Sequence, residues 1–225
     1  MVSLEIIGDL HAAPDVAARI DAIWEEETRR HSHLFDGPIL SVAEIAGNRL
    51  NLVRASYRHS LAARRDPHIA AILTLRPLAV TGVLSCPQGW LFGRRGAEVT
   101  QGRDMWELAP SGGATSADLE AQILEELEQE IGLVPSQVTV LPPAGIVESD
   151  GVVDIVMPIT TGLDDERIVA LHRERGSREY AELKVCPPDD RQLEALPLLA
   201  ETRTILAALS GSIPGSWRFP PRNPA

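Results

Sequence analysis

The pattern of apolar and polar positions predicts a small mixed unit at the start of the chain. The segment SLEIIGDL largely alternates between the two kinds, as a half-buried strand does, whereas PDVAARIDAIWEEETRR places its apolar residues at helical spacing. After a turn at 36–38, ILSVAEIA and LNLVRASY predict two strands joined by Gly47 and Asn48, a pair typical of hairpin turns. We therefore expect residues 1–70 to form an α+β extension.

The pattern changes near residue 71. From RPLAVTGVLSCPQGWLFGRR onward, short apolar segments are separated by Pro and Gly, and a helical pattern then leads to strands in GIVESDGVVDIVMPITT and YAELKVCP. A second helical pattern, DRQLEALPLLAETRTILAAL, is interrupted at Pro197. Mixed strands with one central and one late helix predict an α/β sandwich over residues 71–210. The Pro-rich tail, 211–225, is expected to be extended or irregularly packed.

The central helical pattern lies in WELAPSGGATSADLEAQILEELEQEIGL, residues 106–133. This segment predicts a strand end, a loop and a helix that begins near Ser116 or Ala117, with Ser116 as the N-cap. At about 100° per residue, the apolar residues of the helix form one stripe: Leu119, Ile123, Leu124, Leu127 and Ile131.

Two glutamates of this helix are placed where they can act together. Glu126 and Glu130 are four residues apart, hence only about 40° apart, at the edge of the apolar stripe. Glu125 and Gln129 face the opposite way. Two carboxylates at this spacing repel each other by roughly 0.2–0.5 kcal/mol on an exposed helix, and a hard cation reverses that sign. The spacing alone is compatible with a solvated acidic face or with a Mg²⁺ site.

Charge and cysteine content narrow the classes of function. The chain has 32 acidic and 21 basic residues, a net charge of −11, which disfavours nucleic acid as a partner. Cys86 and Cys186 are the only cysteines, so neither a disulfide framework nor structural zinc is indicated. The start MVSLEIIGDL lacks the basic end of a secretory signal, and no apolar run reaches membrane-spanning length. We expect a cytoplasmic protein without a membrane partner.

The segment around the helix resembles the box of the Nudix hydrolase superfamily. That box is a Gly, five spacers, Glu, seven spacers, Arg-Glu, a bulky aliphatic residue, one spacer, Glu-Glu, one spacer, Gly and a final aliphatic residue. Aligned on Gly132, the matching residues are Glu126, Leu127, Glu130, Gly132 and Leu133. The departures are Ser111 and Ala117 at the first Gly and first Glu, Glu125 at the Arg, and Gln129 at the first paired Glu. A gap of one or two residues lets Gly112 or Gly113 serve as the first Gly.

The resemblance implies a fold and a set of roles. The fold is a Nudix-type α/β/α sandwich with a mixed sheet, preceded by the α+β extension. Glu126 and Glu130 are implied to be catalytic and to hold Mg²⁺, with Mn²⁺ as the other candidate. Ser111, Gly112 and Gly113 would contact the substrate, and their loop would let a backbone carbonyl join the metal shell. Since Gln129 is a poorer ligand than a carboxylate, the number of metal ions is left open.

Two further groups of residues are candidates for the same site. Arg94 and Arg95 could clamp a diphosphate, because guanidinium groups offer paired donors; a surface pair at a strand end is an equally open interpretation. Family members often carry an acidic base after the box. The candidates here are Glu148 and, in the expected loop LHRERGSREY, Glu174 and Glu179.

The implied activity is Mg²⁺-dependent cleavage of the diphosphate in a nucleoside diphosphate linked to another group. HLFDGPILSV and RASYRHSLAARRDP resemble the N-terminal region of a Nudix branch that includes a UDP-glucose pyrophosphatase, so a UDP-sugar is the first candidate substrate and ADP-ribose the second. The alternative interpretation of RASYRHSLAARR is a solvated basic segment. Two rival hypotheses are a Nudix-fold protein that binds a nucleotide or nucleotide sugar without hydrolysis, and a purely structural protein. The extension could also contribute to a homodimer.

Overall fold

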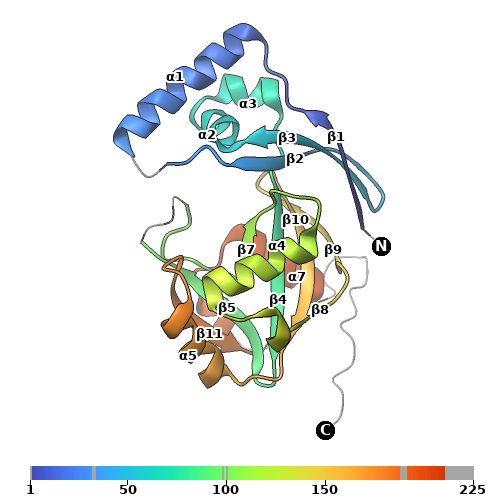
Figure 1. Cartoon of the computed structure of the whole chain (residues 1–225), viewed down its shortest axis with the longest axis vertical. Coiled ribbons are helices and arrows are strands. Elements are labelled where there is room, and N and C mark those ends of the chain that lie inside the picture. Colours follow the sequence, from blue (N-terminus) through green and yellow to red (C-terminus); the bar gives the residue numbers. More distant parts are fainter. Residues whose placement is uncertain (1, 32–33, 98, 100, 188–191, 211–225) are drawn as a thin grey trace.

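The chain folds into two sheets stacked along the long axis of the molecule (Figure 1). The structure is a computed structural model that describes residues 2–31, 34–97, 99, 101–187 and 192–210. The first sheet and its helices form the upper layer in Figure 1, and the second sheet forms the lower part. The Pro-rich tail expected at 211–225 lies outside the described residues.

The first sheet is built from the segments that the sequence predicted as strands. It has the order β1-β3-β2, with β1 parallel and β2 antiparallel to β3. Its strands are β1 (Ser3–Asp9), β2 (Pro38–Ala46) and β3 (Arg49–Ser56). The β2–β3 turn contains Gly47 at φ 64°, a left-handed conformation that glycine adopts without strain. The predicted hairpin and first strand are therefore present.

Three helices cover this sheet, of which the sequence pattern revealed only the first. They are α1 (Pro14–Arg30), α2 (Tyr57–Arg65) and α3 (Pro67–Leu73). The interpretation of RASYRHSLAARR as a merely solvated segment is wrong in part, because Leu61 and Ala62 of α2 are buried. Ser56 starts α2 through a reciprocal cap with His59, and the Asp66 side chain caps α3. The two caps divide the segment into two short helices, which hydrophobic spacing alone does not predict.

The second sheet has eight strands with one parallel pair. Its central path is β11-β5-β4-β10-β8, while β6 pairs with β5, β7 with β4 and β9 with β10. Only β4 and β10 run parallel among these pairs. The strands are β4 (Leu78–Cys86), β5 (Gly89–Arg95), β6 (Trp106–Leu108), β7 (Ser111–Gly113), β8 (Thr139–Val140), β9 (Gly145–Ser149), β10 (Val152–Thr160) and β11 (Tyr180–Cys186).

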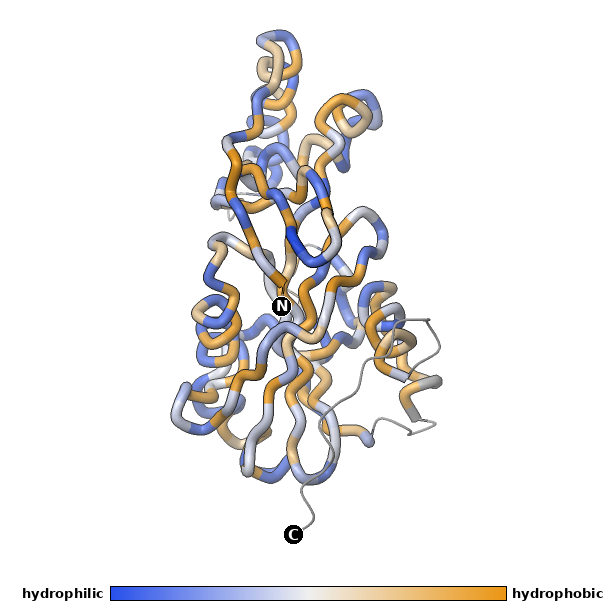
Figure 2. The backbone as a smooth tube through the Cα atoms, turned by 90° about the vertical axis from the view of Figure 1, so that its right-hand side faces the viewer, coloured by the Kyte–Doolittle hydropathy of each residue, from blue (hydrophilic) through white to orange (hydrophobic). Residues whose placement is uncertain are grey.

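Helices cover both faces of the second sheet, which makes the predicted α/β/α sandwich. One face carries α4 (Leu119–Glu126), its π-helical continuation η1 (Leu127–Ile131) and α5 (Asp165–Arg175). The other face carries α6 (Gln192–Ala195) and α7 (Ala200–Leu209), and a 3-10 turn, η2 (Pro135–Gln137), precedes β8. In Figure 2, hydrophobic and hydrophilic positions alternate along these elements, as expected when one side of each faces a core. Among the described residues, no helix has both the length and the apolar character needed to cross a membrane.

The two sheets share one hydrophobic core. Four apolar residues of the first sheet, Leu40, Val42, Leu50 and Leu52, are at most 2% exposed and belong to the same cluster as the second sheet and α4. The backbone N–H of Leu40 donates to the Ala114 carbonyl (3.0 Å), and that of Val42 donates to the Arg76 carbonyl (2.8 Å). The predicted boundary at residue 70 lies within α3, and the division into an extension and a 71–210 domain stays a prediction.

Three sequence-based boundaries need correction. The central helix begins at Leu119, and its N-cap is Asp118, whose carboxylate accepts the Ala121 N–H (3.1 Å), so the expectation of Ser116 was wrong. Ser111–Gly113, expected to be loop, forms the short strand β7 because it pairs with β4. The segment LHRERGSREY is mostly not a loop, since its first half is the end of α5. In each case the pattern was too short to separate helix, strand and loop.

Candidate functional site

The candidate site lies where β7 faces the end of α4 and the following η1 turn. Gly112 lies against the side chain of Glu126, because a Cβ on Gly112 would be 2.3 Å from Oε1 of that glutamate. Gly113 has open space at the same position. Of the two glycines considered as the first Gly of the box, Gly112 is therefore the one that the packing requires.

Glu126 is held by a side chain one turn earlier in the helix. The amide nitrogen of Gln122 donates to Oε1 of Glu126 (2.9 Å), and the amide oxygen of Gln122 accepts the backbone N–H (3.2 Å) and hydroxyl (2.8 Å) of Thr115. Burial raises the pKa of the Glu126 carboxyl, and the Gln122 hydrogen bond opposes that rise. The loop before α4 thus orients Glu126 through Gln122.

Glu130 is the more buried member of the pair. It is 2% exposed, and its Oε2 accepts the backbone N–H of Ser111 at 3.4 Å. Its Oε1 is buried and has no hydrogen-bond partner among the described residues. Burial raises the pKa of Glu130 well above its usual range, with further increases from the nearby charges of Glu179, Glu126 and Glu107. A buried carboxylate oxygen without a donor is a group that a cation would satisfy.

The helix changes geometry at Glu130. The Gly132 N–H reaches back to the Leu127 carbonyl (3.0 Å), which gives the π-type turn η1, and Gly132 ends it at φ 83°. The Glu130 carbonyl is bonded to Nδ1 of His172 (2.9 Å), and the Gln129 carbonyl accepts the Ser177 N–H (2.9 Å). The end of α5 and the following loop therefore fix the part of the helix that carries Glu130.

Arg95 connects two further carboxylates to this region. Its Nη1 donates to Oε1 of the buried Glu107 at 2.6 Å, and its Nη2 lies 3.9 Å from Oε1 of Glu179. Burial raises the pKa of Glu107 to about 7, although Arg95 and Tyr180 lower it. Gly93 makes room for the Tyr180 ring, because a Cβ there would lie 2.4 Å from it. Arg95 thus offsets part of a local negative charge.

The other predicted substrate arginine has a different environment. Arg94 forms ion pairs with Asp104 (3.0 Å) and Glu182 (3.1 Å), as expected for adjacent residues whose side chains point to opposite sides of a strand. The structure therefore brings Arg95 to the carboxylate cluster and leaves Arg94 with acidic partners elsewhere.

The three candidates for a catalytic base separate clearly. The negative charge of Glu179 raises the pKa values of both Glu126 and Glu130. Glu148 lies 3.9 Å from Arg76, and Glu174 lies 3.7 Å from Arg167. Of the three, only Glu179 interacts with the glutamates of the central helix.

A buried carboxylate on the opposite face of the sheet completes the polar network. Oδ1 of Asp154 accepts the Thr81 hydroxyl (2.8 Å), and that hydroxyl also lies 3.2 Å from Oγ of Ser111. Burial raises the pKa of Asp154 to about 6. Ser111 therefore connects the two carboxylates. Its hydroxyl reaches Asp154 through Thr81, and its backbone N–H donates to Glu130.

Comparisons with known proteins bear on the fold. No family model matches the sequence, and no curated protein matches it significantly. Among solved structures, DR0079 from Deinococcus radiodurans is 12% identical, with a TM-score of 0.53 over 76% of this chain and 98% of that chain. A Nudix hydrolase from M. Smegmatis, RenU, is 21% identical (TM-score 0.46, 64% of this chain, 91% of that chain). The NUDIX domain of Shewanella oneidensis NrtR, complexed with ADP ribose, is 16% identical (TM-score 0.45, 68% and 96%). The chain shares its fold with DR0079, and its sheet and helices form the α/β/α sandwich that the resemblance to the Nudix box implied.

The departures from the Nudix box lie away from the pair of glutamates. Gln129 donates to Glu125 at 2.9 Å on the exposed side of the central helix (α4 with η1). The sequence predicted that both residues lie on that side. This amide–carboxylate hydrogen bond replaces the Arg–Glu pair of the family pattern at the same spacing. The two changes are therefore compensatory in structure.

The two glutamates of the central helix can hold a Mg²⁺ ion only if substrate phosphates or water supply the remaining ligands. Within the described part of the chain, no three His, Cys, Asp or Glu side chains converge as a ready-made metal site. Mg²⁺ commonly binds through one or two carboxylates, substrate phosphates and water. Glu126, the unpartnered Oε1 of Glu130 and the adjacent Ser111–Gly113 backbone suit that partial set of oxygen ligands.

Sequence reasoning missed several residues of the site. Glu107, Gln122, Asp154 and Tyr180 come from different elements, and none is part of a spacing that predicts convergence. Only the contact of Gln122 could have been predicted, because Gln122 lies four residues before Glu126 on the same face of the central helix.

Proposed function

We propose that this protein hydrolyses the diphosphate of a nucleoside diphosphate linked to another group, with Mg²⁺ held by Glu126 and Glu130. The observation that carries the proposal is the buried Oε1 of Glu130, which has no hydrogen-bond partner among the described residues, in a helix whose Glu126 lies against Gly112 of β7. Two carboxylates in a partly buried place repel each other unless a cation joins them. The cation would neutralise diphosphate charge and lower the pKa of a bound water.

The protein side chains supply orientation and local charge. Gln122 holds the Glu126 carboxylate, and the Ser111 N–H holds one oxygen of Glu130, so the free oxygens point in fixed directions. Arg95, whose side chain is 16% exposed, offers a positive charge next to the cluster and would oppose the charge of a bound diphosphate.

Glu179 is our candidate for the general base. Its side chain is 39% exposed, its charge acts on both glutamates, and its Oε1 lies 3.9 Å from Arg95. A carboxylate in this position can accept a proton from the attacking water, after which the phosphoryl group is displaced in line.

A UDP-sugar is the first candidate substrate and ADP-ribose the second. The choice rests on the likeness of the segments 33–42 and 54–67 to a branch that includes a UDP-glucose pyrophosphatase. Their described residues include the start of β2, the end of β3 and all of α2; β2 contacts β4 of the second sheet, and α2 packs on α1.

The test is release of nucleoside monophosphate from UDP-glucose, ADP-ribose and a wider panel of diphosphates, with and without Mg²⁺. Glu126→Gln and Glu130→Gln should each lower the rate roughly a hundredfold or more, since several kcal/mol of charge stabilisation is lost. Gln129→Ala should change it far less. Glu179→Gln should also be impaired, with Glu174→Gln as its matched control.

Two outcomes would contradict the proposal in different ways. If no diphosphate in the panel is turned over, but a nucleotide binds, the protein is a Nudix-fold binding protein. If turnover is Mg²⁺-dependent yet unchanged in both glutamate variants, the assignment of the metal ligands is wrong.

A further inference from the structure

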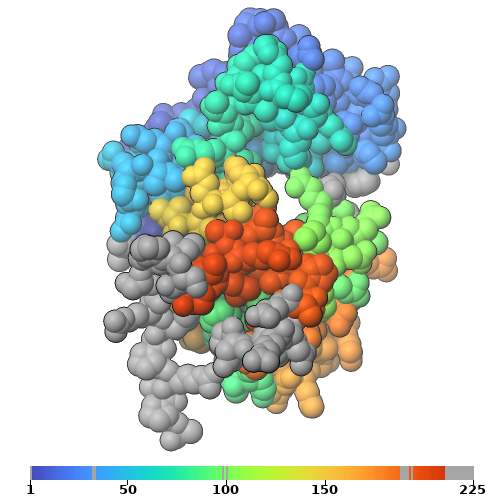
Figure 3. Space-filling view, turned by 180° about the vertical axis from the view of Figure 1, so that it is seen from behind, coloured from blue at the N-terminus to red at the C-terminus, as the bar shows by residue number. Residues whose placement is uncertain are grey.

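A cavity of about 750 Å³ separates the helices of the first layer from the segment that precedes β6. Figure 3 shows the molecule hollowed between α2 and that segment. Its volume is in the range of pockets that hold ligands of cofactor size. The residues that line it and are used below are Glu27, Tyr57, Leu61, Arg64, Arg65 and Arg103. None of them belongs to the carboxylate site.

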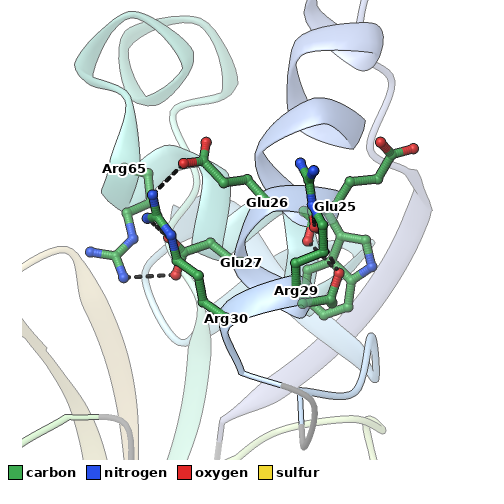
Figure 4. A network of polar contacts seen from close by, with 8 residues as sticks. Glu25, Glu26, Glu27, Arg29, Arg30 and Arg65 are labelled. Atoms are coloured by element: carbon green, nitrogen blue, oxygen red, sulfur yellow. Dashed lines mark hydrogen bonds and ion pairs between the residues drawn. The ribbon is translucent and has the colours of Figure 1, made fainter.

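The cavity gathers positive charge in a strongly acidic protein. Three arginines line it, against a net charge of −11 for the whole chain. Among the described lining residues only Glu27 is acidic; it is 5% exposed and already bonded to Arg65 (2.8 Å, Figure 4) and to Arg30 (3.4 Å). The Arg65 hydrogen bond lowers the pKa of Glu27. Glu27 therefore neutralises the charge of Arg65, but not the charges of Arg64 and Arg103.

Arg64 and Arg103 have no acidic partner among the described residues. Arg64 is nevertheless held in place by neutral groups. Its Nη1 donates to the Ser60 hydroxyl (2.8 Å), and its guanidinium carbon lies 5.4 Å from the centre of the Tyr57 ring. With the Gln101 amide turned so that its oxygen faces Arg64, that oxygen accepts from Nε at 3.1 Å. Arg64 is thus oriented before any ligand binds.

The wall opposite α2 is anchored as well. Nε of Arg95 donates to the backbone carbonyl of Gln101 at 3.1 Å. Gln101 therefore bonds through its side chain to the cavity and through its backbone to the site of Arg95. This contact gives the cavity a defined width at the position of Arg64.

We propose that this cavity is a binding site for a nucleotide-sized organic phosphate. The guanidinium groups of Arg64 and Arg103 would hold the phosphate, because their paired donors match its oxygens. Tyr57 and Leu61 offer an apolar wall for the remainder of the ligand. The position between two layers suits a small molecule, and the net charge of −11 disfavours a nucleic acid. This inference stands independently of the proposed hydrolysis.

The experiment measures binding by calorimetry on the full chain with EDTA present, so that no divalent metal contributes. The probes are UMP, AMP, uridine, inorganic phosphate and a short single-stranded oligonucleotide. We expect saturable binding of at least one monophosphate, with uridine and inorganic phosphate each binding about tenfold or more weakly, since each lacks one half of the contacts.

The variants separate this site from the carboxylate pair. Arg64→Gln with Arg103→Gln should weaken monophosphate binding about tenfold or more, whereas Arg49→Gln, an exposed arginine of β3 outside the cavity, should not. Glu130→Gln should bind as the wild type does, even if it is inactive. Circular dichroism checks that each variant is folded.

Three results would overturn the inference. One is the absence of saturable monophosphate binding, and another is equal binding by the wild type and the double arginine variant. The third is tighter binding of the oligonucleotide than of any monophosphate, which would make the arginines part of a nucleic-acid surface. None of these results depends on whether the protein hydrolyses a diphosphate.

Discussion

At the scale of single residues, Gly112 is constrained by the side chain that it faces. The added methyl group of Gly112→Ala would meet Oε1 and Cδ of Glu126 at 2.3 and 2.6 Å, so that carboxylate must move, while the backbone need not. We expect about tenfold or greater loss of Mg²⁺-dependent turnover, because small displacements of catalytic groups have large effects on rate. The stability should change little, as measured by urea unfolding.

The matched control for this prediction is the next residue. Gly113→Ala places its methyl group in open space, so both turnover and stability should stay near the wild-type values. Equal effects of the two substitutions would show that the contact with Glu126 is unimportant.

Asp154 gives a prediction about pH at the same scale. Its pKa is raised from 3.8 to about 6 by burial, so the folded protein keeps a proton that the unfolded chain loses between these values. The contribution of Asp154 to stability is therefore most favourable below pH 4 and falls as the pH rises toward 6, by a total of about 3 kcal/mol. Asp154→Asn, which does not ionise, should remove this part of the pH dependence.

The measurement is the free energy of unfolding by urea at several pH values from 4 to 8. The variant should gain stability relative to the wild type as the pH rises. A difference that stays constant over this range would show that Asp154 does not titrate as its burial requires.

At the scale of elements, the start of the central helix depends on Asp118. Its carboxylate accepts the Ala121 N–H, one of the donors that the first turn leaves free, and its charge is favourable at the positive end of the helix. Asp118→Ala should destabilise the protein by about 1 kcal/mol, measured by urea unfolding. The matched change Ser116→Ala should have a smaller effect, because Ser116 only supports the turn before the helix. The opposite order would restore Ser116 as the cap.

At the scale of the whole molecule, the first layer is part of the core of the second. Its residues Leu40, Val42, Leu50 and Leu52 are almost fully buried in the shared cluster, and β2 donates two backbone hydrogen bonds across the junction. A chain that begins at residue 71 would expose the apolar surface that these residues cover, which favours aggregation. We expect low solubility or loss of cooperative thermal unfolding. A soluble, folded and fully active 71–225 chain would contradict this.

The sequence by itself determined the kinds of elements and the faces of the central helix. Alternation and helical spacing are local properties, so they identified α1, the β2–β3 hairpin and the central helix. They also predicted that Glu125 and Gln129 lie on the exposed side of that helix. It also identified Glu126 and Glu130 as a pair, because a spacing of four fixes their relative direction on any helix.

Only the tertiary structure decided which other groups meet that pair and where the cavity lies. Glu107 and Asp154 lie on separate strands and Glu179 lies just before β11, so strand pairing rather than local spacing sets their positions. The position of Arg64 in the basic segment 54–65 also depends on the tertiary structure. Arg64 lines the cavity because α2 packs opposite the segment before β6. Contacts between residues far apart in sequence depend on how layers pack, and no periodicity within one segment encodes that packing.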